Sequence, residues 1–185
     1  MNKYCNHINF TMFPLKKYDF DWTPKTKPTV ADVSLDQINP QLKKIMRDLG
    51  VYVSWIQVFY RPERDYCAIH TDNGGGDYIK INWAYGGVGS NMTWYSFKPG
   101  QENAGVVHET EVNSDFIVHK PEDVVLEHTD EIIEGIPAVV QVGIPHHLDN
   151  QLNQRYCISF SISSAKTHRR LTMQESIDVF KDYYL

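Results

Sequence analysis

The middle of this chain consists of short segments in which apolar and polar residues alternate, and this pattern limits the possible folds more than any other feature. The first segment, 51–60, reads Val-Tyr-Val-Ser-Trp-Ile-Gln-Val-Phe-Tyr, a β-branched and aromatic run typical of a strand. Further segments with strand character lie at 66–72, 78–85, 91–97, 105–111, 115–119, 138–144 and 155–163. Many short strands with Gly- and Pro-containing turns predict an antiparallel sandwich or barrel.

Helical patterns lie on either side of this region. Apolar residues recur at helical spacing over 36–49, and Gly50 follows as the expected stop. The run Thr172-Met-Gln-Glu175 fits the capping box of a second helix. Residues 1–35 predict an irregular arm with room for one strand. We therefore expect a single domain over 1–185, with the arm and first helix over 1–50, a strand-rich core over 51–163 and a C-terminal helix over 164–185.

Composition excludes some classes of function. The chain has 185 residues and a net charge of −5, so no electrostatic footprint for nucleic acid or an anionic membrane is visible. No apolar run is long enough to span a bilayer, and the polar start is no signal peptide. The three cysteines, Cys5, Cys67 and Cys157, are scattered, which suits a reducing compartment better than a disulfide framework. We expect a cytoplasmic protein.

The triplet His70-Thr71-Asp72 is the most informative short motif. Residues two apart in a strand point to the same side, so one imidazole and one carboxylate share a face. Together they make up two thirds of the 2-His-1-carboxylate face that binds non-haem iron(II). A third ligand from a distant segment would complete such a site.

Strand parity selects His146 as that third ligand from among eight histidines. Val140, Val142 and Ile144 share one face of the preceding segment, and His146 continues their parity, so it should point inward. A second triplet, His128-Thr129-Asp130, repeats the motif in an acidic context and is interpreted as surface. The gap from His70 to His146 leaves room for the intervening strands of a jelly roll.

The last strand segment, 155–163, has two unlike faces. Tyr156, Ile158, Phe160 and Ile162 form an apolar face, which usually turns to a core. The opposite face carries Arg155 among small polar side chains. That face could meet solvent, or it could form the wall of a polar pocket.

These residues resemble the iron(II)- and 2-oxoglutarate-dependent oxygenases, whose motif is HxD…H followed by a basic residue. The chain has His70-Thr71-Asp72, then His146, then Arg155 nine residues later. Tyr60, ten residues before His70, and the spacing of Arg155 resemble the prolyl-hydroxylase-like branch, in particular its small phage and bacterial members. The resemblance covers about 51–163. It departs from the family at 63–65, which is charged where glycine is common, and at three consecutive glycines after the motif.

The resemblance implies a mainly β fold, a double-stranded β-helix (jelly roll) with a few flanking α-helices. It also implies that His70, Asp72 and His146 bind iron(II), and that the protein hydroxylates a C–H bond while 2-oxoglutarate and O2 yield succinate and CO2. Arg155 would bind the distal carboxylate of 2-oxoglutarate through its guanidinium fork. Tyr60 would donate a hydrogen bond to the same carboxylate, and Ser159 is a weaker candidate for that task.

Two other classes of function remain open. One is a non-catalytic jelly-roll module that binds a ligand or a protein, and the other is a cupin-type metalloenzyme without 2-oxoglutarate. Arg155 separates the first from an oxygenase, because a relic of such a site has no reason to keep a carboxylate anchor. The substrate is not named by the sequence; an amino-acid or peptidyl side chain is expected by analogy alone, ahead of nucleic acid.

Overall fold

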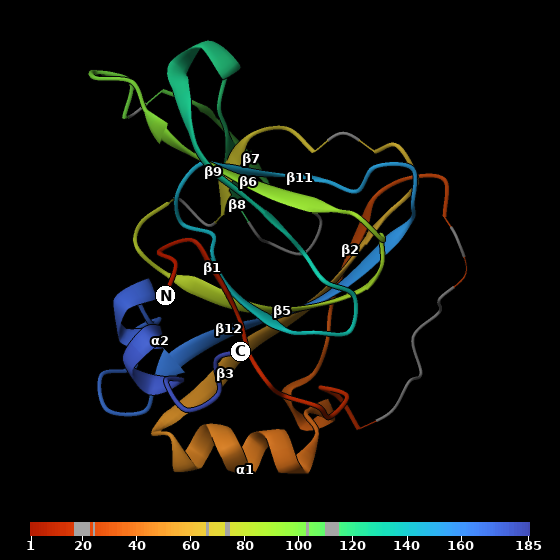
Figure 1. Cartoon of the computed structure of the whole chain (residues 1–185), viewed down its shortest axis with the longest axis vertical. Helices are drawn as coiled ribbons and strands as arrows, with labels where there is room; N and C mark the ends of the chain where they lie inside the picture. The colour runs from red at the N-terminus through yellow and green to blue at the C-terminus, as the bar shows by residue number, and fades with distance from the viewer. Residues whose placement is uncertain (17–22, 24, 66, 73–74, 103, 110–114) are drawn as a thin grey trace.

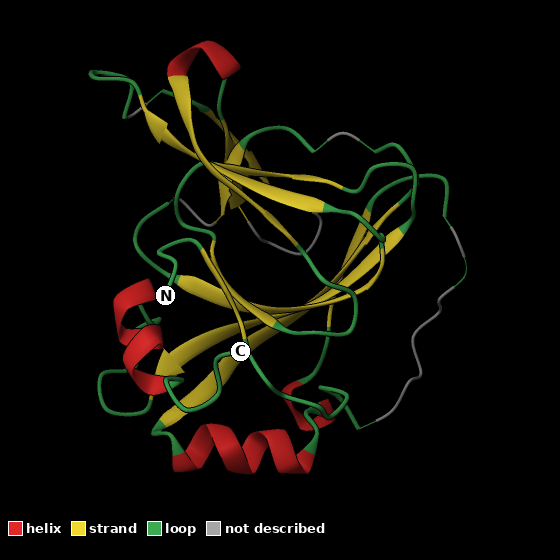
Figure 2. Ribbon diagram, in the orientation of Figure 1, coloured by secondary structure: helices red, strands yellow, loops and turns green. Residues whose placement is uncertain are grey.

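A computed structural model describes residues 1–16, 23, 25–65, 67–72, 75–102, 104–109 and 115–185. The fold is mainly β: two six-stranded sheets face each other, and two α-helices lie beside the first sheet (Figures 1 and 2). All the strand pairs are antiparallel. The prediction of an antiparallel β-sandwich or barrel is therefore confirmed.

The first sheet contains, in spatial order, β1 (Cys5–His7), β10 (Ala138–Gln141), β5 (Ile79–Gly86), β12 (Arg155–Ser164), β3 (Val51–Arg61) and β2 (Thr29–Asp32). The second sheet contains β7 (Val106–Glu109), β8 (Asp115–Val118), β4 (His70–Asp72), β11 (His146–Asp149), β6 (Asn91–Phe97) and β9 (Val124–Glu131). The helices are α1 (Pro40–Asp48) and α2 (Met173–Val179), and 3-10 turns form at Leu35–Gln37 and Pro121–Asp123.

The order of the strands identifies a double-stranded β-helix, as expected for the jelly-roll fold. From β3 to β6 the chain alternates between the sheets, and after β9 it alternates again through β10, β11 and β12. Returning strands therefore insert beside earlier ones: β12 lies between β3 and β5, and β11 lies between β4 and β6. This insertion brings segments that are far apart in sequence, such as β4 and β11, into direct contact.

The main hydrophobic core lies on the outer face of the first sheet, away from the second sheet. There Trp83, Ile158 and Phe160 pack with Leu42 of α1 and Phe180 at the end of α2. A smaller apolar cluster, which includes Met92 and Trp94 of β6, lies between the sheets. The inner face of the first sheet is therefore free to carry polar groups near the mouth of the barrel.

This arrangement decides between the two interpretations of the last strand. The apolar face of β12 joins the outer core, and Arg155, Cys157 and Ser159 on the other face line a cavity between the sheets. The polar face of β12 is thus a pocket wall and is not exposed to solvent.

The helix boundaries follow their sequence signals. Asn39 caps α1, with its side chain accepting a hydrogen bond from the backbone N–H of Gln41, and Gly50 has a φ of 72° just after the helix. The predicted capping box of α2 is present between Thr172 and Glu175. The helix predicted over 36–49 is divided, because a 3-10 turn at Leu35–Gln37 precedes α1.

Several strands differ from their predicted bounds. The segment 66–72 is a strand only over β4, and residue 66 lies outside the described residues. The segment 138–144 ends as a strand at Gln141, because the chain then crosses to the second sheet and begins β11 at His146. The strand β9 is not predicted by the sequence. The N-terminal arm, for which one strand is expected, has two, β1 and β2, at opposite edges of the first sheet. Residues 110–111 of the predicted strand 105–111 also lie outside the described residues.

No helix in the described part of the chain is long and apolar enough to cross a membrane.

Gly143 allows the crossing between β10 and β11 to pass close to the segment after β4. The Gly76 N–H donates to the carbonyl oxygen of Gly143 at 2.8 Å, and the Asp72 N–H donates to that of Val142 at 3.0 Å. A Cβ atom on Gly143 would lie 1.8 Å from the Gly76 carbonyl oxygen. Backbone has to move to accommodate it, and that movement would reach Asp72 and His146.

We therefore predict that Gly143→Ala lowers the free energy of unfolding by about 3 kcal/mol or more, as overpacking against backbone does at its upper end. Gly100→Ala is the control: Gly100 has a φ of 83° but open space around its Cβ position, so it should lose only about 1–2 kcal/mol. Urea unfolding of both variants measures the difference. Equal losses would contradict the close contact at Gly143.

Candidate metal centre

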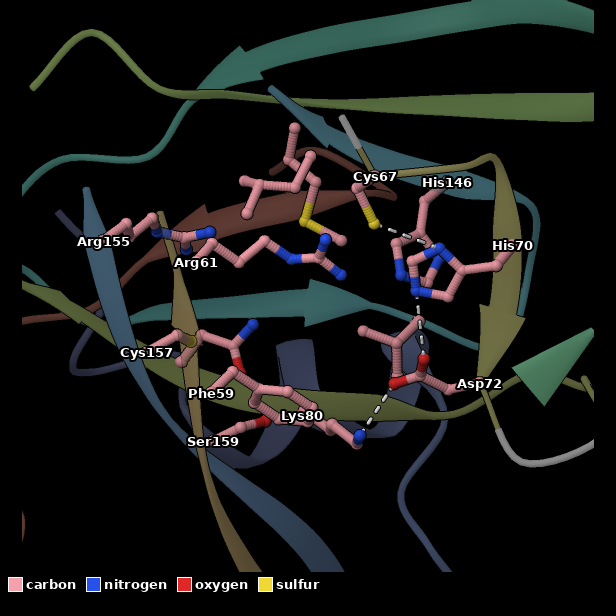
Figure 3. A pocket seen from close by; sticks show the side chains of 14 residues that line it. Phe59, Arg61, Cys67, His70, Asp72, Lys80, His146, Arg155, Cys157 and Ser159 are labelled. Atoms are coloured by element: carbon pink, nitrogen blue, oxygen red, sulfur yellow. Dashed lines mark hydrogen bonds and ion pairs between the residues drawn. The ribbon is translucent and has the colours of Figure 1, made fainter. Parts of the chain in front are cut away.

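Three potential metal ligands meet between the two sheets. His70 and Asp72 lie at the two ends of β4, and His146 begins β11, where it pairs directly with His70. One ligand atom from each of the three side chains lies within 4.8 Å of the others. Figure 3 shows the two imidazole rings side by side, with the Asp72 carboxylate facing them. The parity argument that chose His146 is consistent with this placement.

Backbone carbonyl groups orient both imidazole rings. Nδ1 of His70 lies 2.9 Å from the carbonyl oxygen of Ala68, and Nδ1 of His146 lies 2.8 Å from that of Ile144. A carbonyl oxygen can only accept, so Nδ1 carries the proton in each ring. The Nε2 atoms are then the ones that can bind a metal ion, and the hydrogen bond at Nδ1 fixes each ring in that orientation.

Lys80 balances the charge of Asp72. Its Nζ lies 2.7 Å from Oδ2 of Asp72, and the lysine is buried. Burial opposes ionisation of Asp72, but the positive charge of Lys80 and the hydrogen bond from His70 outweigh it and hold the Asp72 pKa well below its ordinary value. Asp72 is thus an ionised carboxylate whose Oδ1 faces His70 at 3.4 Å.

The two histidines differ in their protonation. Burial and the neighbouring His70 lower the pKa of His146 to about 3, so its ring is neutral, the form that binds metal. Burial also disfavours the charged form of His70, but Cys67 and Asp72 outweigh it and raise the His70 pKa to about 10. A metal ion that binds His70 therefore has to displace a proton.

The three ligand candidates lie on one side of a cavity, the inner cavity, whose opposite wall is the polar face of β12. Arg155 is only 4% exposed there. Among the described residues no carboxylate pairs with Arg155, and its Nε atom is buried with no hydrogen-bond partner. Burial lowers the Arg155 pKa from its ordinary value, yet a guanidinium stays charged in proteins. A buried, uncompensated cation is costly unless an anion joins it, so the inner cavity is suited to an anionic ligand.

Ser159 lines the same cavity, whereas Tyr60 does not enter it. Phe59 and Arg61, on either side of Tyr60, point into the inner cavity, so Tyr60 points to the other face of β3. There its ring packs 4.8 Å from that of Tyr156, and its hydroxyl donates to the carbonyl oxygen of Lys25 at 2.9 Å. The expectation that Tyr60 shares a ligand with Arg155 needs correction, because alternation along the strand separates them.

The repeated triplet at 128–130 does not join the site. It lies on β9, at the edge of the second sheet, where half-buried His128 stacks on Tyr4 and contacts Asp130 and Asn2. His147 also points away from the ligand cluster and contacts the Tyr95 hydroxyl at 2.9 Å.

The sequence analysis did not single out three residues that line the inner cavity: Arg61, Cys67 and Lys80. Lys80 had a usable signal, because a lysine in the apolar segment 78–85 has the parity of Asn82, which also lines the cavity. Arg61 had none, since it follows the end of the predicted strand 51–60. Cys67 had none either, because it lies in the predicted strand 66–72 with the parity opposite to that of His70 and Asp72. The Cys67 sulfur lies 3.6 Å from Nδ1 of His70.

Comparisons with known proteins add little to this description. No protein-family model matches the sequence, and no curated protein matches it. Two solved structures of YcfD from Escherichia coli, one described as a ribosomal oxygenase, align over 97% of this chain at 13% identity, with TM-scores of 0.43 and 0.37. Vicilin from Solanum melongena aligns over 90% at 8% identity, with a TM-score of 0.36. The chain covers 45%, 43% and 44% of these solved chains, which is less than half of their length. Function has to be argued from the site itself.

Because Lys80 compensates a buried carboxylate, we predict that Lys80→Met destabilises the metal-free protein by about 3–5 kcal/mol. A bound divalent cation would supply the missing positive charge, so the loss should be smaller with Mn²⁺ present. Urea unfolding with and without MnCl₂ measures both values. The exposed Lys166→Met is the control and should change little under either condition. An equal loss with and without the metal would contradict the charge argument.

For Tyr60→Phe we predict a loss of about 1 kcal/mol in the free energy of unfolding, since the part-buried hydrogen bond of the hydroxyl to the Lys25 carbonyl oxygen disappears. Calorimetric titration should give the same affinity for 2-oxoglutarate as in the unsubstituted protein, because the hydroxyl is absent from the inner cavity. A clear drop in that affinity would restore the role first expected for Tyr60.

Proposed function

We propose that this protein is an iron(II)- and 2-oxoglutarate-dependent dioxygenase that hydroxylates a C–H bond of a small molecule or side chain. One observation carries the proposal: a cavity with two imidazoles and a carboxylate on one side has a buried arginine on the other, and no described residue gives that arginine a counter-ion. The first group of residues suits a metal ion, and the second suits the far carboxylate of a ligand bound to that metal.

The donor set fits iron(II). Two imidazoles and one carboxylate on one face make up the facial triad of non-haem iron(II) oxygenases, and here the ion would displace the proton of His70 on binding. His70, Asp72 and His146 would hold the ion, with Lys80 keeping Oδ2 of Asp72 engaged so that Oδ1 faces the imidazoles. When bound, iron with 2-oxoglutarate and O2 supplies the oxidation that yields succinate, CO2 and a hydroxylated product.

Arg155 would bind the distal carboxylate of 2-oxoglutarate. Its guanidinium fork matches a carboxylate in two parallel hydrogen bonds, and burial strengthens that pairing by excluding water. Ser159, four residues further along the same face of β12, would add a hydroxyl donor. This arrangement orients the cosubstrate along the cavity, from β12 towards the ligand cluster.

The two alternative classes account for less of the site. A binding module without catalysis explains neither the fixed Nε2 orientation of both histidines nor the contact of His70 with an ionised aspartate. A metalloenzyme without 2-oxoglutarate explains the ligands but leaves Arg155 without an anion. We further propose a reducing, cytoplasmic setting, since Cys5, Cys67 and Cys157 are all buried as free thiols.

The decisive experiment is an anaerobic titration with iron(II) and 2-oxoglutarate, followed by visible absorption. We expect a metal-to-ligand charge-transfer band, because a keto acid chelated to iron(II) gives one. His146→Ala should lose both the iron and the band. A folded, iron-loaded protein without the band would falsify the proposed cosubstrate.

Arg155→Met tests the anchor separately. We predict that it keeps the iron but needs at least about tenfold more 2-oxoglutarate to develop the band, which corresponds to about 1.4 kcal/mol of lost binding. The matched control is Arg169→Met, which removes an exposed arginine and should behave like the unsubstituted protein. An unchanged requirement in Arg155→Met would remove Arg155 from the proposal.

A further inference from the structure

A second cavity, the outer cavity, adjoins the inner cavity at the ligand cluster. His70, Asp72, Lys80, Phe59, Cys67 and Arg61 line both. The outer cavity has a volume of about 310 Å³, within the size range of small-molecule sites. Arg155 lines the inner cavity and is absent from the outer one, whose further walls come from β2 and β8. A ligand in the outer cavity would thus meet the ligand cluster without lying against Arg155.

The two cavities together are positively charged, although the whole chain is acidic. Among the described residues that line them, three lysine and arginine side chains are cations and one side chain is a carboxylate, and His70 becomes neutral once a metal displaces its proton. The cations are Arg61, Lys80 and Arg155, and the carboxylate is Asp72. Lys80 and Asp72 neutralise each other at 2.7 Å, which leaves the two arginines as the excess. A positively charged substrate is disfavoured in such a site, and an anion is favoured.

Arg61 and Arg155 differ in their counter-ions. Arg155 is buried and has none among the described residues, whereas a terminal guanidinium nitrogen (Nη1) of Arg61 contacts Oδ2 of Asp65 at 2.6 Å. The side chains of Arg61 and Asp65 are 25% and 17% exposed, so this ion pair is reachable from solvent. Asp65 does not line either cavity. The guanidinium therefore has its resting partner outside the cavity and further donors available to a ligand within it.

The rest of the outer cavity is largely apolar. Phe116 of β8 contributes an aromatic wall, and its ring lies edge-on to that of His70 at 5.8 Å. Phe59 lies on the β3 side, and Pro28 and Val30 line the cavity from the N-terminal arm. An apolar body held between these walls would lie beside His70, next to the metal site.

We propose that the outer cavity binds the primary substrate, a small molecule with an apolar body and a carboxylate group, and that Arg61 pairs with this carboxylate. This inference rests on the proposed function, because the bound molecule is a substrate only if the ligand cluster belongs to the proposed dioxygenase. Arg61 would release Asp65, wholly or in part, when the ligand arrives. Asp65 is then a built-in competitor of the substrate, and removing its charge should tighten binding.

Calorimetry with two probes tests this directly. The probes are 4-phenylbutyrate and the uncharged 4-phenylbutan-1-ol, titrated into protein loaded anaerobically with iron(II) and 2-oxoglutarate so that Arg155 is occupied. We expect the acid to bind about tenfold or more tightly than the alcohol. Arg61→Gln should abolish that preference, and Asp65→Asn should increase it.

The two variants separate binding from stability. If the ion pair is purely structural, both substitutions should loosen the turn after β3 and weaken binding of the acid alike. If Asp65 competes with the substrate, Arg61→Gln should weaken binding of the acid and Asp65→Asn should strengthen it. If Arg61→Gln does not fold, Asp65→Asn carries the test alone, since misfolding cannot tighten binding. Equal affinity for acid and alcohol would overturn the inference. So would a loss of 2-oxoglutarate affinity in Arg61→Gln as large as in Arg155→Met, which would make Arg61 part of the cosubstrate anchor.

A parallel titration of 4-phenylbutyrate into metal-free Arg155→Met protein distinguishes this inference from the proposed function. If iron(II) and 2-oxoglutarate give no charge-transfer band but the acid still binds in an Arg61-dependent way, the dioxygenase proposal fails and the anion site remains. If the band forms and the acid shows no dependence on Arg61, the dioxygenase remains and the carboxylate substrate is excluded.

Discussion

The structure depends on the first sheet burying its apolar face outside the barrel. Trp83, Phe160 and their neighbours pack against the helices and the N-terminal arm, and this outer core supplies the hydrophobic stabilisation. The inner face of the first sheet therefore does not have to supply this stabilisation. It can carry Lys80, Asn82 and Arg155 between the sheets, where a barrel with an inward-facing core would need apolar side chains. The hydrophobic stabilisation from the outer core offsets the desolvation cost of several buried charges in the site.

Those buried charges form a partly completed electrostatic arrangement. Lys80 and Asp72 compensate each other, and the carbonyl oxygens of Ala68 and Ile144 fix the imidazole rings. Arg155 is left over. A divalent cation at the histidines and aspartate would add two positive charges and displace the proton of His70, and a dianionic cosubstrate reaching Arg155 would add two negative charges, so the net charge of the cavity would fall by one. Because the charges of the cation and the anion largely offset each other, the two would bind there together more readily than either alone.

Alternation along single strands predicted which ligand candidates share a face. The contacts between the two sheets depend on long-range register, which alternation does not give. His146 could be chosen because Val142 and Ile144 share its parity, and that parity survives the crossing from β10 to β11. The same rule, applied to β3, would have rejected Tyr60, since it shares the parity of the buried Val58 in the outer core. At Tyr60 strand alternation and the spacing of the resemblance disagree, and the position of the side chain follows alternation. The ion pair between Lys80 and Asp72 could not be predicted, because it depends on how β5 of one sheet faces β4 of the other.

The two arginines differ in burial and in their ion pairs, and this difference suggests an order in which two anionic ligands would bind. Arg155, on the inner face of β12, is buried and has no acidic partner among the described residues. It therefore suits a ligand that stays bound while another exchanges. Arg61 lies at the junction of the cavities and already holds a carboxylate that solvent can reach, which suits a ligand that comes and goes. An inner anion held by Arg155 would therefore be in place before an outer anion displaces Asp65. The order of binding would follow from burial alone, without any movement of the sheets.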